Sequence, residues 1–68
     1  MEFHLKTEFI TLGQLLKALG MASTGGDAKY LLESGEVIVN GEPESRRGRK
    51  LRPNDTVAFP NGDSFVMK

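Results

Sequence analysis

The residues best suited to chemistry in this sequence are five cations packed into seven positions. The segment from 46 to 52 reads Arg-Arg-Gly-Arg-Lys-Leu-Arg and contains five of the nine Lys and Arg residues of the chain, with no acid among them. A guanidinium group offers a planar fork of donors to phosphate oxygens, and an ammonium group adds a mobile point charge. Gly48 would let the backbone approach a ligand closely. The segment therefore predicts a phosphate-binding loop in which five side chains contact phosphate: Arg46, Arg47, Arg49, Lys50 and Arg52. Arg52 is the weakest candidate because it adjoins a turn.

A plainer interpretation of this basic segment is a solvated loop whose arginines pair with Glu42, Glu44 and Asp55. Two features favour binding. Solubility is usually served by interspersed charges of both signs, whereas here the cations are segregated. Turn and strand signals also flank the segment, so a folded scaffold displays it. Because basic clusters of this length are weak motifs alone, an acidic protein partner stays open beside nucleic acid.

A second phosphate-friendly feature is Thr24-Gly25-Gly26, at the start of an expected helix. Free amides at a helix N-terminus form an anion site, and glycines let a phosphate come close. Lys29, one turn later, would add a positive charge at the flank of that site. The alternative is that the two glycines only make a tight turn between helices.

The remaining reactive residues predict neither a catalytic nor a metal centre. Cysteine is absent and His4 is the single histidine, so thiolate zinc sites, thiol nucleophiles and histidine clusters are excluded. General acid–base catalysis needs a positioned pair of titratable groups in a pocket, and His4 has no evident partner. A chain of 68 residues can hardly enclose the roughly 300–1,000 Å³ of an ordinary ligand pocket. We therefore expect a protein that is not an enzyme, with no cofactor and no small-molecule substrate.

Composition predicts one small domain over residues 1–68. The chain is 38% hydrophobic and 26% charged, which is too apolar for a disordered chain. Its formal net charge is zero, so local fields rather than total charge decide what docks. No apolar run approaches the roughly 20 residues that span a bilayer, and the first residues lack the basic and apolar parts of a signal segment. The expectation is a cytoplasmic protein without a membrane partner.

The elements that position these residues begin with a helix over residues 12–19. Thr11 and Gln14 form a capping-box pattern at its start, and Gly20 stands where a left-handed residue would end it. Lys17 lies roughly opposite the apolar stripe, so its side chain should face water or a ligand. Four leucines at helical spacing form that stripe: Leu12, Leu15, Leu16 and Leu19.

A second helix of about ten residues follows. Thr24 is its expected N-cap, Asp27 lies in the first turn where the helix dipole favours an anion, and Gly35 ends it. A helix this short is not stable alone, so it must pack on the first helix as a hairpin. Tyr30 lies roughly opposite its apolar side and could stack on an unpaired base if exposed, although partial burial is the commoner outcome. Three residues supply the buried side: Ala28, Leu31 and Leu32.

The hydrophobic period then changes to that of strands. Alternating or apolar runs predict strands at residues 2–5, 36–39, 56–59 and 64–67, and Asn40-Gly41 is the strongest hairpin-turn signal. The return segment 42–45 carries a proline, so it should be an edge or irregular strand. The predicted fold class is α+β: a two-helix hairpin packed on one face of a small, mainly antiparallel sheet of short strands. Two further turns are expected, at Pro53-Asn54-Asp55 and Asn61-Gly62.

The order of these signals resembles the RNA-binding domain family named after small-subunit ribosomal protein S-four. The resemblance covers about residues 11–59, and its most specific part is Gly35-Glu36-Val37-Ile38-Val39-Asn40-Gly41, which fits the family pattern Gly-x-Val-x-Val-Asn-Gly. The later turn ending in Asp55 fits as well, and the basic run is similar to that of small stand-alone bacterial members of the YaaA type.

The resemblance implies the alpha-L RNA-binding motif. It also implies a non-catalytic module that binds structured ribosomal RNA, in a ribosomal subunit or its precursor, during ribosome assembly or related RNA handling. The chain departs from the family at two RNA-contacting places. Many members carry arginine where this chain has Thr11, and Ser-Arg where it has Thr24-Gly25; Lys29 replaces a later arginine. The basic segment would compensate for the missing contacts. The alternative is a protein-interaction adaptor whose basic loop docks on an acidic partner.

Overall fold

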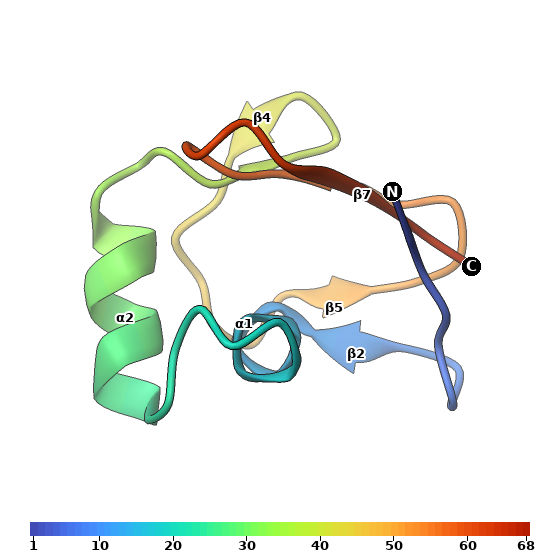
Figure 1. The fold of residues 1–68 in the computed structure, drawn as a ribbon, viewed down its shortest axis with the longest axis horizontal. Coiled ribbons are helices and arrows are strands. Elements are labelled where there is room, and N and C mark those ends of the chain that lie inside the picture. Colours follow the sequence, from blue (N-terminus) through green and yellow to red (C-terminus); the bar gives the residue numbers. More distant parts are fainter.

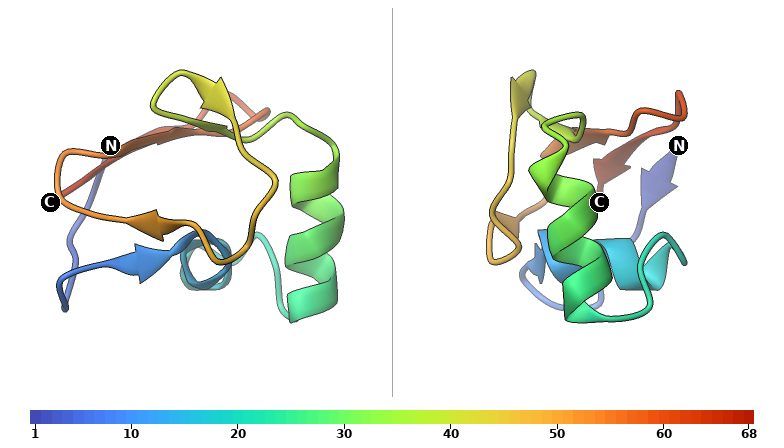
Figure 2. Two further views of the ribbon diagram at one scale, coloured as in Figure 1. Left: turned by 180° about the vertical axis from the view of Figure 1, so that it is seen from behind. Right: turned by 90° about the vertical axis from the view of Figure 1, so that its left-hand side faces the viewer.

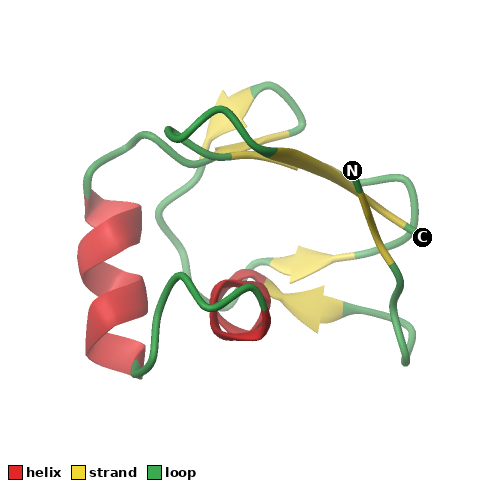
Figure 3. Cartoon of the chain, in the orientation of Figure 1, coloured by secondary structure: helices red, strands yellow, loops and turns green.

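The computed structural model describes all residues from Met1 to Lys68. It has the predicted α+β architecture: a five-stranded sheet lies over the first helix, and the second helix stands at one side (Figure 1). A short two-stranded ribbon continues the lower layer beside the first helix (Figure 3). The elements in chain order are β1 (Glu2–Phe3), β2 (Ile10–Thr11), α1 (Leu12–Ala18), α2 (Gly25–Glu33), β3 (Ile38–Val39), β4 (Glu42–Pro43), β5 (Lys50–Leu51), β6 (Thr56–Ala58) and β7 (Ser64–Met67).

The main sheet has the strand order β1-β7-β6-β3-β4. All neighbours in it are antiparallel except β1 and β7, which are parallel and bring the two ends of the chain together. Val57 in β6 pairs with Val39 of β3 on one side and with Phe65 of β7 on the other. β4 lies at the edge, as the proline at position 43 predicts, because proline cannot donate to a further strand.

The Asn40-Gly41 hairpin turn is confirmed. Both residues have positive φ, 51° and 84°, which is the backbone that a type I′ turn requires. The side-chain oxygen of Asn40 also accepts a hydrogen bond from the Thr56 amide at 2.9 Å, and its amide group donates to Asp55 at 3.0 Å. The turn therefore fastens the β3–β4 hairpin to the start of β6.

Both helices begin at their predicted caps. The Gln14 amide donates to Thr11 Oγ1 at 3.2 Å and the Thr11 amide donates to Gln14 Oε1 at 3.0 Å, which completes the capping box. In α2 the Asp27 amide donates to Thr24 Oγ1 at 3.1 Å. The helices end slightly earlier than expected, at Ala18 and Glu33, since the last residue before each left-handed glycine serves as the cap.

The β2–β5 ribbon was not predicted, and it corrects the interpretation of the basic segment as a loop throughout. Ile10 pairs with Leu51 and Thr11 with Lys50, so the second half of the segment is a strand. The first half descends from β4 beside α2 before it turns into β5 (Figure 2). Leu51 is fully buried, which explains why the strand forms here.

One apolar core joins the two layers. The leucine stripe of α1 is buried from Leu12 to Leu16, whereas Leu19 at the helix end is only partly buried. Val37 and Phe59 are buried although both lie outside the strands in which they were expected. The other members of the core are Ala22, Ala28, Leu32, Val39, Leu51, Val57 and Met67. Because α1, α2 and the ribbon all pack on this core, their relative positions are fixed, and so is the surface where they meet.

Candidate nucleic-acid interface

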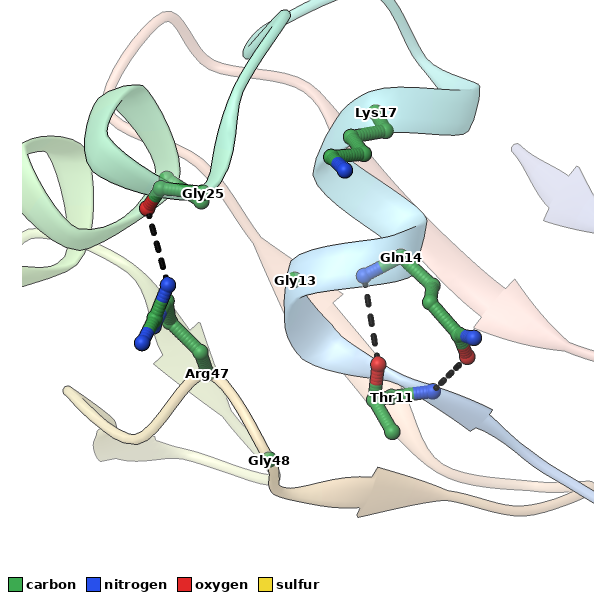
Figure 4. A pocket seen from close by; sticks show the side chains of 8 residues that line it. Thr11, Gly13, Gln14, Lys17, Gly25, Arg47 and Gly48 are labelled. Carbon is green, nitrogen blue, oxygen red and sulfur yellow. Dashed lines mark hydrogen bonds between the residues drawn. The ribbon is translucent and has the colours of Figure 1, made fainter.

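An open cleft of about 550 Å³ lies where α1, the start of α2 and the basic segment meet (Figure 4). Its lining contains no acid and one apolar residue, so it is a surface of cations, hydroxyl and amide groups. The cleft is not surrounded by the core but lies open on the surface, between the elements that pack around it. The lining residues are Thr11, Gly13, Gln14, Lys17, Gly25, Ala28, Arg47 and Gly48.

Arg47 crosses from the basic segment to the start of α2. Its Nη1 donates a hydrogen bond to the Gly25 carbonyl at 3.1 Å. Glycine at position 25 permits this close approach, because a Cβ there would lie 2.7 Å from that nitrogen and would push the Arg47 side chain aside. The predicted glycine and the predicted arginine are therefore brought together, and each explains the position of the other.

Lys17 is the second cation of the cleft. It extends from α1 toward the side where Gly25 and Arg47 lie (Figure 4). Neither Lys17 nor Arg47 forms an ion pair with a carboxylate. Two full positive charges therefore face the same cleft.

The first turn of α2 offers free amide groups to this cleft, whereas the first turn of α1 does not. In α1 the amides of Leu12 and Gly13 donate to the carbonyls of Arg49 and Arg47, at 2.8 and 2.9 Å. In α2 no protein group accepts from the amides of the first two residues, Gly25 and Gly26. A helix N-terminus with free donors and a positive dipole end attracts an anion, so only α2 can contribute in this way.

The carboxylate of Asp27 belongs to the same turn but is already engaged. It accepts hydrogen bonds from the Ser23 hydroxyl at 2.8 Å and from the Ser23 amide at 3.4 Å. These bonds, with those from Thr24, hold the pKa of Asp27 below its usual range. The residue does not line the cleft.

Two arginines of the basic segment share one carboxylate, Glu44, which offsets one of their two positive charges. Arg46 Nη2 lies 3.0 Å and Arg49 Nε 3.2 Å from Glu44 Oε1. The hydrogen bonds from the Arg46 side chain lower the pKa of Glu44 to about 2, so the carboxylate stays ionised. For these two residues the plainer interpretation, a loop whose arginines pair with nearby acids, is the one that the contacts favour. Glu42 makes no such pair, and Asp55 accepts from the Arg52 backbone amide instead.

Lys50 and Arg52 are held by an aromatic ring instead of an acid. Lys50 Nζ lies 5.0 Å and Arg52 Cζ 5.7 Å from the centre of the Phe9 ring. Lys29 points elsewhere: it pairs with Glu33 at 3.9 Å and is not part of the cleft lining. Tyr30 is 83% exposed on α2, also outside the cleft. Thr24 and Gly26 adjoin the cleft through their neighbour Gly25.

Several cleft residues escaped the sequence analysis. Gln14 was read only as part of a helix cap, Thr11 only as a cap and as a departure from the family's arginine, and Gly13 was not singled out as a site residue. The one available signal was Lys17, whose place opposite the leucine stripe indicated that it faces water or a ligand. No three His, Asp or Glu side chains gather to form a possible metal site. Neither of the two helices has the length and apolar character needed to cross a membrane.

Comparison with known proteins agrees with the resemblance seen in the motifs. A family model described as S4 domain matches residues 3–67, which extends the similarity beyond residues 11–59. A protein of Bacillus subtilis (strain 168), described as a probable ribosome maturation protein, RlbA, is 49% identical over 63 residues. That alignment covers 93% of this chain and 89% of the Bacillus protein.

Proposed function

The chain belongs to the S4 domain family, and from this premise we propose that it is a non-catalytic module that binds structured ribosomal RNA during ribosome assembly. The similarity to a ribosome maturation protein over nearly the whole length of both chains supports the process. The observation that carries the binding role is the acid-free cleft, in which two unpaired cations face the free amides of a helix start.

The cleft would hold the RNA backbone through charge and shape. Lys17 and Arg47 supply positive charge from opposite sides, and the amides of Gly25 and Gly26 can donate to a phosphate oxygen between them. Gln14 adds a neutral amide donor, because its Oε1 is used by the Thr11 amide while its NH₂ group remains free. Few groups are placed to read base edges, so the geometry of a folded RNA should matter more than its sequence.

The salt dependence of binding to a ribosomal RNA fragment tests this proposal. Each neutralised phosphate contributes about −0.7 to −0.9 to the slope of log affinity against log salt. Replacing both cleft cations, K17Q with R47Q, should make the slope shallower by about 1.4 to 1.8 and weaken binding. A matched control is K29Q with K68Q, which removes the same charge from lysines that are paired with Glu33 and Glu2.

The outcome separates RNA binding from its alternative. Equal changes in the cleft variant and the control would show that only total charge matters and would contradict the proposed site. RNA that copurifies with the protein should be removed by nuclease or high salt. A nuclease-resistant complex with an acidic protein, and no affinity for RNA, would instead identify an adaptor.

A further inference from the structure

The outer face of the β2–β5 ribbon carries two cations that form no ion pair, Lys50 and Arg52. The charge of Arg52 is partly offset by the nearby Asp55 carboxylate, which accepts a hydrogen bond from the Arg52 backbone amide at 2.7 Å. Ile10 and Leu51 are opposite each other and pack on the core. Because side chains alternate along a strand, their neighbours Phe9, Lys50 and Arg52 face outward. Phe9 is half-buried: it is not part of the core cluster, but one side of it lines a hollow with Phe3, Leu5 and Ile10. The two cations lie over its ring.

The manner in which these cations are held distinguishes them from the rest of the basic segment. Glu44 offsets one of the two positive charges of Arg46 and Arg49, whereas Lys50 and Arg52 lie over an uncharged ring and form no ion pair. A cation–π contact restrains a side chain but leaves its full charge available to an anion. The ribbon face is therefore positively charged and partly ordered before any ligand arrives.

This face is continuous with the cleft. Thr11 belongs to β2, pairs with Lys50 and also lines the cleft. Gly48, in the turn two residues before β5, also lines the cleft. No element separates the two surfaces, so a polyanion that leaves the cleft on this side meets the ribbon next.

We propose that the outer face of the β2–β5 ribbon, made by Phe9, Lys50 and Arg52, is a second phosphate-binding surface that lengthens the RNA site beyond the cleft. The inference rests on the proposed function, because it assigns this surface to the backbone of the same RNA. It also reverses the ranking expected from the sequence: Arg52 becomes a principal ligand, and Arg46 and Arg49 serve mainly to hold the segment in shape.

Two double variants of equal charge test the assignment. K50Q with R52Q should make the salt slope shallower by about 1.4 to 1.8, as expected for two lost phosphate contacts. R46Q with R49Q removes the same formal charge from the same segment and should change the slope by less than half as much. Urea unfolding of each variant checks that binding is measured on folded protein. A ribbon variant with an unchanged slope, or a larger change in the Glu44-paired variant, would overturn the inference.

The ring and the RNA length give two independent measurements. F9L keeps all charges and should weaken binding about threefold to tenfold without changing the slope, because only the restraint on the two cations is lost. Shortening the RNA to the smallest fragment that still needs Lys17 and Arg47 should abolish the effect of K50Q with R52Q. An unchanged affinity in F9L would contradict the role of the ring, and a persisting ribbon effect on that shortest fragment would contradict the separate surface.

The cleft variant K17Q with R47Q distinguishes a failure of the ribbon surface from a failure of RNA binding itself. If it alone reduces the slope, RNA binding stands and the ribbon surface is wrong. If neither the cleft variant nor the ribbon variant reduces the slope, both the ribbon surface and the proposed RNA-binding function are wrong.

Discussion

Replacing Gly25 with alanine should separate the stability of this protein from its RNA binding. The new methyl group would lie 2.7 Å from Arg47 Nη1, a distance that real contacts do not allow. The colliding atom is the far end of a flexible side chain, so Arg47 can move aside while the backbone stays in place. The variant therefore displaces a cation of the cleft without removing it.

The expected cost in stability is small because two effects oppose each other. Alanine is favoured over glycine in a helix by up to about 1 kcal/mol. The exposed hydrogen bond from Arg47 to the Gly25 carbonyl, which the substitution breaks, contributes about 0.5–1.5 kcal/mol. The free energy of unfolding should thus stay within about 1 kcal/mol of the unaltered protein. Binding should suffer more, because a hydrogen bond between a charged group and a ligand is worth about 1.5–3 kcal/mol, which is at least about tenfold in affinity.

The assay combines urea unfolding with RNA titration, and Gly26→Ala is the matched control. A Cβ at position 26 meets only Thr24 Oγ1, at an ordinary 3.7 Å, so it brings the same helix preference but leaves Arg47 in place. We expect Gly26→Ala to be at least as stable as the original and to lose less affinity than Gly25→Ala. A Gly25→Ala protein that binds RNA as well as the original, while R47Q binds weakly, would refute the argument from close approach. A loss of more than about 2 kcal/mol in stability would show that the backbone, not the side chain, gives way.

Two further predictions concern the scaffold. Glu44→Gln should lower the free energy of unfolding, measured in urea, by about 1 kcal/mol at pH 7. The fold lowers the pKa of Glu44 from 4.5 to about 2, so this contribution is complete above about pH 4.5 and should disappear as the pH falls through 2. The control Glu42→Gln should have no effect on unfolding at either pH. Asn40→Ala should destabilise the protein by about 2–3 kcal/mol. The substitution removes the hydrogen bonds to Asp55 and Thr56 and places a residue that disfavours positive φ at φ 51°. Asn40→Gly, which tolerates that φ, should recover about 1 kcal/mol of the loss, and a glycine variant no more stable than alanine would contradict the backbone part of the argument.

The features that the sequence predicts correctly are those determined by neighbouring residues. A capping box needs only Thr11 and Gln14, and a left-handed helix end needs only a glycine such as Gly20 or Gly35, both at φ 75°. The Asn40-Gly41 turn is equally local. Hydrophobic period then orients each helix on the core. These signals suffice for the α+β class and for the order of its elements.

The ribbon and the charge pairing could not be read from the sequence in the same way. β2 and β5 are each two residues long and far apart in the chain, so no periodic pattern marks them. Their pairing depends on Leu51 reaching the core beside Ile10, which is decided only when the whole chain folds. The choice of Glu44 as partner for Arg46 and Arg49 follows from the turn between them, in which the Arg49 amide donates to the Arg46 carbonyl at 3.3 Å. Five cations adjacent in sequence therefore contact three different kinds of partner.

The pairing pattern explains how a chain with no net charge can present a polyanion site. Glu2, Glu33 and Glu44 are ion-paired with Lys68, Lys29 and two arginines, and none of them lines the cleft. Of the cations without an ion pair, Lys6 lies elsewhere, and the other four lie on the surface formed by the cleft and the ribbon: Lys17, Arg47, Lys50 and Arg52. Because the whole protein is neutral, its field at long range is weak, and attraction should arise only within about a Debye length of this surface, roughly 8–10 Å at physiological salt. Such a protein gains little from electrostatic steering. If the protein prefers a folded RNA over a simple polyanion, as the proposed function expects, that preference must come from the fixed positions of a few charges. Displacing Arg47 by one methyl group is therefore a more severe test than lowering the total charge.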